Sequence, residues 1–403
     1  MKLTQARALQ ILDSRGMPTI EVRLACNKGF SAKYSVPAGA SRGDNEAIEL
    51  RDGGKSYGGN GVGKAVKLIN EDLQAELLGR VFSSQNNFDD WLRTVDPSAT
   101  KAHLGGNTTL ALSGAFAHLQ AAHAKTPLWK IFQSFTKQQP AFPRIFANLV
   151  NGGKHAPGLD IQEFMVVPKT TRPSEAVAQV YDFHHRLQDE LVKRYGDSAK
   201  LVGDEGGMAP HGAKSAEILD LLAELRDHSP ACELALDVAA SSFFADGSYN
   251  FEGHKLSSEG WQDTLLTLAR EHKIASIEDP FAETDLKSFS RLKDEQPNFY
   301  VVGDDVTVTD PKRIAALASD GSITGVIIKP NQIGTISETI SAVLTAQQHN
   351  LFTIISHRSG ETNDTLIIDL AYGMAADGVK IGAPRRGERV AKYNRLLEIE
   401  AGL

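Results

Sequence analysis

Six short apolar runs in the second half of the chain each end on an ionisable side chain. The runs end at Asp237, Glu278, Asp304, Lys329, His357 and Lys380. Each run has the pattern of a buried strand, and a helical pattern follows almost every one. In a parallel strand–helix barrel the carboxyl ends of all strands open on one face. The pattern therefore predicts a barrel whose mouth gathers three carboxylates, two lysines and a histidine, a set that indicates catalysis.

The start of this barrel is expected to be irregular. Two strand patterns, Arg144–Val150 and Ile161–Pro168, are separated only by Asn151–Asp160. A parallel crossover needs about a dozen residues or more, so these strands are predicted to form an antiparallel hairpin. Helices are predicted at Pro173–Tyr195 and Ala213–Asp227, and a regular strand–helix alternation is expected from there to the end.

The first part of the chain has a different pattern of apolar and polar positions. Thr19–Cys26 and Phe30–Val36 alternate apolar and polar positions, which predicts an antiparallel sheet. Helical patterns follow at Val62–Leu78, Asn86–Val95 and Thr108–Lys125. The sequence thus predicts an α/β protein with an N-terminal α+β capping domain at residues 1–135. A C-terminal (β/α)8 barrel with a ββαα start is predicted at residues 140–403, close to the roughly 250 residues typical of such barrels.

The composition is that of an ordinary globular enzyme. The net charge of -7 and the pI near 6.0 disfavour nucleic acid or an anionic membrane as the main partner. Cys26 and Cys232 form no metal-binding pattern, which favours a reducing, cytoplasmic location. Arg7 interrupts the N-terminus too early for a signal-peptide core, and we find no apolar run long enough to span a bilayer.

One motif points to a chemistry that its context does not support. Gly58–Ala65 reads GGNGVGKA and fits the glycine-rich phosphate loop, but Ala65 stands where that loop needs a serine or threonine hydroxyl for Mg²⁺. The preceding segment also lacks the pattern of a buried strand. We expect a plain loop that enters a helix.

Three carboxylates give the strongest chemical signal. Asp237, Glu278 and Asp304 at neighbouring strand ends would repel one another unless a cation joined them. Ligation by oxygen alone suits Mg²⁺ or Mn²⁺ better than Zn²⁺. The alternative is three separately solvated acids at helix starts, with Asp279 and Asp305 acting as caps.

The basic residues at the mouth suggest a base and an anion site. Burial and nearby divalent cations would disfavour the charged form of Lys329 and make its amine a usable base. Lys380 is expected to stay charged and bind an anion. The segment Ser356–Ser359, SHRS, offers donors suited to phosphate or carboxylate. A structural ion pair for Lys329 and a simple turn for SHRS are the alternatives.

Further candidates lie in loops. Glu163 and Glu205 could take different protonation states and divide acid and base roles, although solvated turn acids would look the same. His155 lies in the predicted hairpin loop near the mouth, and the turn that contains Ser41 could cover a bound ligand. The His184–His185 pair is expected to be solvated on a helix, without a function.

Taken together, these segments resemble enolase, the glycolytic enzyme that interconverts 2-phosphoglycerate and phosphoenolpyruvate. The resemblance runs nearly end to end and includes ILDSRGMPTIEV, NGGKH, QEFMVVP, GDEGGMAP, SIEDPFAE, IIKPNQIGT and SHRSGET. It implies a small α+β domain followed by a barrel that opens with a hairpin and two helices. It also implies a homodimer that requires Mg²⁺ and acts on a phosphorylated hydroxy acid.

The resemblance assigns the metal ligands by position. Asp237, Glu278 and Asp304 would hold the tighter Mg²⁺. Ser41, on a closing loop, would help to hold a second Mg²⁺ that arrives with substrate. Two cations would stabilise the dianionic intermediate that forms when a proton is removed beside a carboxylate.

The resemblance also assigns the catalytic and binding residues. Lys329 would take the proton from C2, and Glu205, assisted by Glu163, would protonate the departing C3 hydroxyl. The residues implied to bind the substrate are His155, Glu163, Ser356, His357, Arg358, Ser359 and Lys380.

The chain departs from the family pattern at a few positions: Ala38, Arg42, Lys154, Ser242, Asn363 and Ile381. Arg42 and Lys154 add positive charge near the expected mouth. Three hypotheses follow: a phosphopyruvate hydratase, which is a hydro-lyase; an enolase-like paralogue that performs the same elimination on a phosphonate or carboxyphosphonate; and a catalytically dead binding scaffold. Retention of Lys329, Glu205 and the three metal carboxylates disfavours the scaffold.

Overall fold

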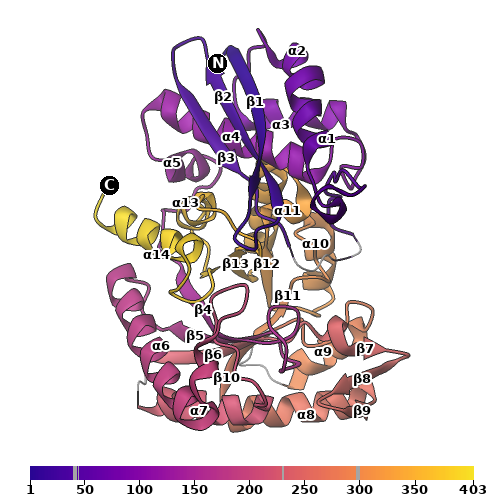
Figure 1. Ribbon diagram of the computed structural model, residues 1–403, viewed down its shortest axis with the longest axis vertical. Helices are drawn as coiled ribbons and strands as arrows, with labels where there is room; N and C mark the ends of the chain where they lie inside the picture. Colours follow the sequence, from indigo (N-terminus) through magenta and orange to yellow (C-terminus); the bar gives the residue numbers. More distant parts are fainter. Residues whose placement is uncertain (40–42, 44, 229–230, 296–299) are drawn as a thin grey trace.

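The computed structural model describes residues 1–39, 43, 45–228, 231–295 and 300–403. Two parts are stacked along the long axis of the molecule (Figure 1). A three-stranded sheet with its helices occupies one end, and a closed strand–helix barrel forms the rest. The chain ends beside α5 (Leu128–Gln133), where Leu403, Trp129 and Lys130 line one shallow hollow.

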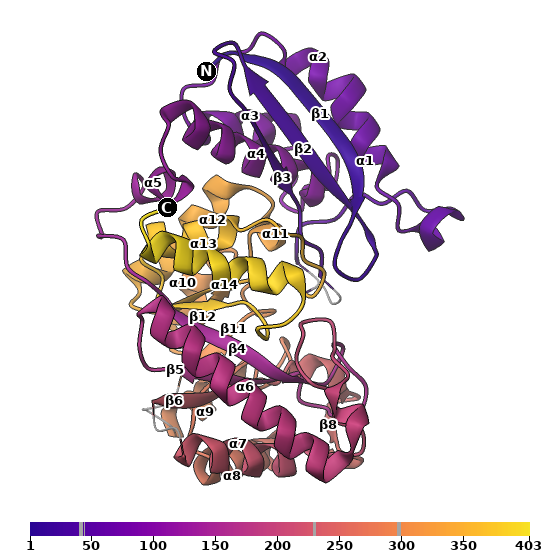
Figure 2. The same ribbon diagram turned by 60° about the vertical axis from the view of Figure 1, so that its left-hand side comes forward.

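The N-terminal sheet has the order β1 (Leu3–Leu12), β2 (Pro18–Cys26), β3 (Ser31–Ser35), with antiparallel pairing throughout. Figure 2 shows the strands side by side with the helices behind them. The predicted pair is confirmed, but β1 was not anticipated. Its register shifts between Leu3 and Gln5, and exposed residues interrupt its buried ones, so it lacks the alternation of a half-buried strand.

Apart from α5, which was not predicted, the helices of this part match the predicted patterns. They are α1 (Gly63–Lys67), a π-helical turn (Leu68–Leu73), α2 (Gln74–Leu77), α3 (Gln85–Val95) and α4 (Gly106–Ala124). The phosphate-loop pattern is a loop that enters α1, as expected. The Asp52 carboxylate accepts hydrogen bonds from the backbone N–H groups of Gly63 (2.8 Å) and Lys64 (2.6 Å). A side chain of the protein thus already takes the anion position at this helix start.

Eight strands close the barrel in the order β10-β11-β12-β13-β14-β4-β5-β6. Their bounds are β4 (Arg144–Asn151), β5 (Glu163–Pro168), β6 (Cys232–Asp237), β10 (Ile274–Glu278), β11 (Tyr300–Gly303), β12 (Gly325–Ile328), β13 (Phe352–Ser356) and β14 (Gly378–Lys380). Strand β5 pairs antiparallel with both β4 and β6, and the other neighbours pair parallel. The predicted hairpin start is confirmed, and two helices follow it, α6 (Pro173–Tyr195) and α7 (Ser215–Asp227).

The remaining helices belong mainly to the outer layer of the barrel, and the short helix Pro330–Ile333 lies at the mouth, where Gln332 contacts Asp304. They are α8 (Ser258–Glu271), α9 (Leu286–Glu295), α10 (Pro311–Ser319), α11 (Pro330–Ile333), α12 (Ile336–Gln348), α13 (Leu366–Gly373) and α14 (Gly387–Glu400), with short 3-10 turns at Ser56–Gly59, Asp197–Lys200 and Ala240–Phe243. Each helix among the described residues is too short or too polar to cross a membrane.

The expectation of regular alternation after residue 232 is wrong at one place. A small antiparallel sheet, β7 (Phe244–Ala245), β8 (Ser248–Phe251) and β9 (His254–Leu256), is inserted between β6 and α8. Two-residue turns, Asp246-Gly247 and Glu252-Gly253, join its strands, and all four turn residues have positive φ. Such turns suit hairpins, so Asp-Gly was an available signal in the sequence.

Side chains from alternating strand positions fill the barrel interior: Phe146, Met165, Val167, Ala235, Val302, Ile327 and Ile354. A larger apolar layer lies between the strands and the outer helices. His184 belongs to the buried face of α6, contrary to the expectation of a solvated pair. Burial lowers the pKa of His184 to about 4 and keeps the ring neutral, whereas His185 is exposed.

Candidate active site

Strand register sets the arrangement of the acidic residues at the barrel mouth. Asp237 and Glu278 are the last residues of β6 and β10, and they pair directly in the sheet. Asp304 follows the last residue of β11. Because β5 runs in the opposite direction, its first residue, Glu163, lies at the same end and pairs with Asp237. The antiparallel strand thus adds a fourth carboxylate to the mouth.

A cavity of about 100 Å³ opens beside Glu163, Asp237 and Asp304, whereas the predicted metal ligand Glu278 is not among the residues that line it. The predicted residues that line it are His155, Glu163, Glu205, Asp237, Asp304, Lys329, Ser356, His357, Arg358, Ser359 and Lys380. Lys154 and Ser242, two departures from the family pattern, also line it. Ser41, predicted as a metal ligand, and Arg42 lie outside the described residues.

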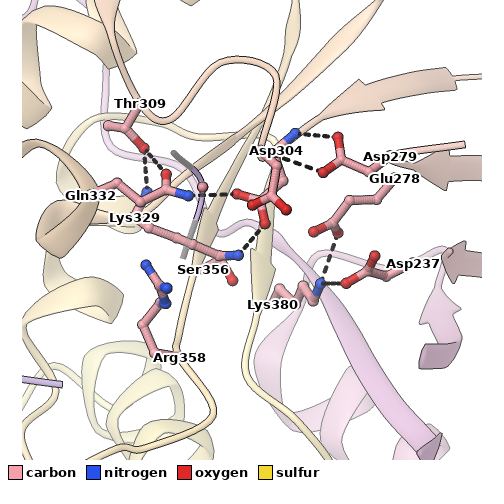
Figure 3. Close-up of polar contacts among 12 residues, drawn as sticks. Asp237, Glu278, Asp279, Asp304, Thr309, Lys329, Gln332, Ser356, Arg358 and Lys380 are labelled. Atoms are coloured by element: carbon pink, nitrogen blue, oxygen red, sulfur yellow. Dashed lines mark hydrogen bonds and ion pairs between the residues drawn. The ribbon is translucent and has the colours of Figure 1, made fainter. Parts of the chain in front are cut away.

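Lys380 contacts three carboxylates, and Figure 3 shows two of them, Asp237 and Glu278. Its buried Nζ lies 3.0 Å from Glu163 Oε1, 3.0 Å from Asp237 Oδ2 and 2.8 Å from Glu278 Oε2. Burial works against the ammonium, but Asp237, Glu163 and Glu278 outweigh it and raise the pKa of Lys380 well above its usual value. Lys380 therefore stays charged, as expected, with carboxylates of its own chain as partners.

Lys329 contacts Asp304 directly. Burial pulls the pKa of Lys329 down, as the sequence suggested, but the Asp304 carboxylate outweighs this effect and raises the pKa above its usual value. The expectation that Lys329 loses its charge is therefore wrong while Asp304 is its partner, and Lys329 stays protonated. Asp304 receives a second hydrogen bond, 2.9 Å, from Gln332 Nε2.

Glu163, Glu205 and His155 form a buried cluster whose ligand atoms lie within 4.8 Å of one another. Burial, and next the charge of Glu205, raise the pKa of Glu163 well above its usual value, and Lys380 offsets this only in part. Burial also acts to raise the pKa of Glu205, but His155 and His357 outweigh it and hold that pKa well below the usual value. The two carboxyl groups therefore differ in protonation, with the proton on Glu163.

His357 is held as a neutral ring that faces Glu205. Its Nε2 lies 3.4 Å from Glu205 Oε2, and Arg389 Nη1 approaches its Nδ1. Burial lowers the pKa of His357 to about 3, with Arg389 acting in the same direction against Glu205. The guanidinium of Arg389 also donates to the backbone oxygens of Arg358 and Ser359, each at 2.6 Å. Arg389 thus shapes the SHRS segment, a role that sequence reasoning missed.

Asp279 is a second residue that was underestimated. It was weighed as a helix cap, but it is buried with φ of 40°, and its carboxylate accepts hydrogen bonds from the backbone N–H groups of Asp304 (2.9 Å) and Asp305 (2.8 Å) (Figure 3). It therefore fixes the turn that presents Asp304. Its position directly after Glu278 was the only sequence signal for this role.

The acidic groups suit a hard divalent cation. Oε1 of Glu278 is buried without a hydrogen-bond partner among the described residues, which leaves a lone pair for a ligand. Burial and the neighbouring Asp237 charge raise the pKa of Glu278 well above its usual value, a repulsion that a cation would relieve. Within the described part of the chain, the three carboxylates whose oxygens lie within 4.8 Å of one another are Asp279, Asp304 and Asp305, and the predicted trio Asp237, Glu278 and Asp304 is not so close.

Comparison with known proteins decides the family. The sequence model described as "Enolase, N-terminal domain" matches residues 3–132, and that described as "Enolase, C-terminal TIM barrel domain" matches residues 139–403. The chain belongs to the enolase family. It is 41% identical to the enolase of Methanocaldococcus jannaschii over 98% of this chain and 94% of that protein. It is 41% identical to the enolase of Methanosarcina acetivorans over 100% of this chain and 95% of that protein. It is 40% identical to the enolase of Aeropyrum pernix over 97% of this chain and 92% of that protein.

These matches confirm the resemblance and the predicted fold class. The chain is therefore a lyase of the phosphopyruvate hydratase class. Enolases as a family depend on a metal and bind a phosphorylated small molecule. The matches do not favour the other two hypotheses, a paralogue acting on phosphonates and a dead scaffold.

Proposed function

We propose that this chain catalyses the reversible dehydration of 2-phospho-D-glycerate to phosphoenolpyruvate, a step of glycolysis and gluconeogenesis. The observation that carries the proposal is the content of one cavity. In it Lys329 contacts Asp304. Glu163 and Glu205, two neighbouring carboxyl groups whose pKa values differ, lie beside Lys380. A base, a protonated carboxyl group and cation ligands are the components that removal of a C2 proton and a C3 hydroxyl requires.

Asp237, Glu278 and Asp304 are proposed to hold one Mg²⁺. A second Mg²⁺, with Ser41 among its ligands, is proposed to arrive with the substrate. Bound there, divalent cations would neutralise both the carboxylates that keep Lys329 protonated and the charge that develops on the substrate carboxylate. The buried, unpartnered Oε1 of Glu278 supports this assignment.

Lys329 is the proposed base at C2. It lies at the end of β12, where burial already acts against its charge, so weakening its contact with Asp304 would lower its pKa toward a working value. Glu205 is the proposed donor to the departing C3 hydroxyl, assisted by Glu163. Because the pKa of Glu205 is held low, the proton that it donates would first have to pass to it from Glu163. Glu163 carries the proton in the cluster, and their shared neighbour His155 lies 3.6 Å from Glu205 Oε2 and 3.8 Å from Glu163 Oε1.

The substrate carboxylate and phosphate are proposed to lie against His155, Glu163, Lys380 and the segment Ser356–Ser359. Burial disfavours the charge of Arg358, but Glu46 and Asp304 outweigh it and raise its pKa, so the guanidinium remains a cation for phosphate. Lys154, which lines the same cavity, adds a further positive charge.

The setting of the enzyme follows the same reasoning. We propose a cytoplasmic homodimer with a capping domain at residues 1–135 and a catalytic barrel at residues 140–403, acting on small molecules rather than nucleic acid. Cys26 and Cys232 are both buried and free, which agrees with a reducing location.

A direct assay tests the proposal. Purified protein is mixed with 2-phospho-D-glycerate, and phosphoenolpyruvate formation is followed by ultraviolet absorbance with and without Mg²⁺. We expect Mg²⁺-dependent turnover of at least about 1 s⁻¹, the lower part of the usual enzyme range. A rate far below this value, together with faster turnover of a phosphonate analogue, would contradict the proposal.

A further inference from the structure

Glu46 comes from the N-terminal part of the chain, yet its carboxylate is buried against the barrel. Oε2 of Glu46 lies 3.1 Å from Nη1 of Arg358, and Oε1 lies 3.4 Å from Nη2. Both side chains are only 5% exposed. A buried carboxylate this close to a guanidinium restricts where that guanidinium can point. Sequence reasoning gave Glu46 no role.

Gln332 extends this contact to the metal side of the cavity. Its Oε1 accepts a 2.6 Å hydrogen bond from the hydroxyl of Thr309, so its amide nitrogen must face the other way. That nitrogen donates to Asp304 Oδ1 at 2.9 Å (Figure 3). It also donates to Glu46 Oε1 at 3.3 Å. One amide group therefore joins the proposed metal ligand Asp304 to Glu46.

The backbone around Glu46 is fixed to the same barrel loops. The N–H of Ala47 donates to the carbonyl of Gln332 at 2.8 Å. On the other side, Ala38 and Gly360 exchange two backbone hydrogen bonds of 2.7 and 2.9 Å. Glu46 thus lies between two attachments to the loops that follow β12 and β13, and its position relative to Arg358 is set by both.

Another buried ion pair between the two parts of the molecule has a purely structural role. Lys101, also from the N-terminal part, contacts Glu338 of α12 at 2.8 Å, with both side chains largely buried. That ion pair joins the two parts of the chain away from the residues that line the cavity. Glu46 differs because its two partners reach the proposed phosphate site and the proposed metal site.

We propose that Glu46 is a positioning residue of the active site, which orients Arg358 for an anionic substrate and, through Gln332, orients Asp304. This rests on the proposed function in so far as Arg358 binds the substrate anion and Asp304 binds Mg²⁺. The chain segment that carries Glu46 is far from both in sequence, so substrate affinity and metal affinity depend on how the N-terminal part is seated on the barrel.

The test uses Glu46→Gln, which keeps the size of the side chain and one acceptor oxygen but removes the charge. We expect KM for 2-phospho-D-glycerate to rise about tenfold or more while kcat changes by less than about threefold, because Arg358 is misoriented rather than lost. Affinity for phosphoenolpyruvate, measured by calorimetry, should fall by a similar factor. Gln332→Ala should weaken Mg²⁺ binding by calorimetry about tenfold, the usual result of losing a group that orients a metal ligand.

Glu338→Gln is the matched control, because it also breaks a buried ion pair between the two parts. It should lower the melting temperature and leave KM and Mg²⁺ affinity unchanged. A folded Glu46→Gln protein with the wild-type KM and phosphoenolpyruvate affinity would overturn the proposal. If the wild type fails to turn over 2-phospho-D-glycerate, the proposed function fails, while Mg²⁺ calorimetry on Gln332→Ala still decides whether the link to Asp304 exists.

Discussion

Nζ of Lys380 lies 2.8 Å from Oε2 of Glu278, although 102 residues separate them in the chain. The two residues end β14 and β10, which are not neighbours in the barrel, so the contact crosses its mouth. Both side chains are buried. Removal of the ammonium would leave buried carboxylates without a counter-charge, which is costly in a low-dielectric site.

Replacement of Lys380 by Met should therefore destabilise the protein by about 3–5 kcal/mol in the absence of metal. Added Mg²⁺ should raise the melting temperature more in this variant than in the wild type, because the carboxylates then have a cation. Thermal unfolding with and without Mg²⁺ measures both effects. Lys392→Met is a suitable control, since Lys392 is buried against Glu361 at 2.8 Å outside the cavity, and it should show no added Mg²⁺ effect. Equal Mg²⁺ shifts in both variants would contradict this assignment.

Replacement of Lys329 by Ala should remove the proposed base and leave the fold intact. We expect kcat to fall by roughly 10³-fold, within the range for loss of a general base. Circular dichroism should be unchanged. Mg²⁺ binding, followed by calorimetry, should persist because Asp237, Glu278 and Asp304 remain. Turnover that survives undiminished would show that another group removes the C2 proton.

Replacement of Asp279 by Ala should loosen the turn that presents Asp304. The Asp279 carboxylate accepts hydrogen bonds from two backbone N–H groups there. Removing the carboxylate leaves both N–H groups unpaired. We expect Mg²⁺ affinity to fall about tenfold, as for other groups that orient a ligand. A titration of activity against Mg²⁺ concentration, checked by calorimetry, measures the change. Wild-type affinity in the variant would mean that the turn holds its shape without Asp279.

His118 should make stability depend on pH. Burial alone would lower its pKa, but Asp364, 3.4 Å away, outweighs burial and raises it. A raised folded pKa stabilises the protein fully below the unfolded value of about 6.5 and loses this contribution as pH rises through the folded value. The free energy of unfolding in urea should therefore decline from about pH 6.5 upward in the wild type relative to His118→Gln. Parallel pH profiles for the two proteins would refute the assignment.

Residues at strand ends could be placed from the sequence. Asp237, Glu278, Lys329 and Lys380 follow apolar runs, and a barrel brings the ends of such runs to one face. Glu163 needed the hairpin inference as well, because its strand runs in the opposite direction. Strands β7–β9 are too short to give an apolar period, and β1 lacks a regular alternation, so neither was found.

The order of apolar runs and their terminal charged residues determined the barrel and its irregular start, because strand patterning is a local property of the chain, and the family resemblance came from the sequence motifs themselves. Tertiary structure alone decided the partners of those charges. Gln332 and Arg358 meet Glu46 across 286 and 312 residues, and such contacts depend on how distant loops pack. The protonation of Glu163 and of Lys329 was decided in the same way, since burial and the nearest opposite charge, rather than residue type, set their pKa values.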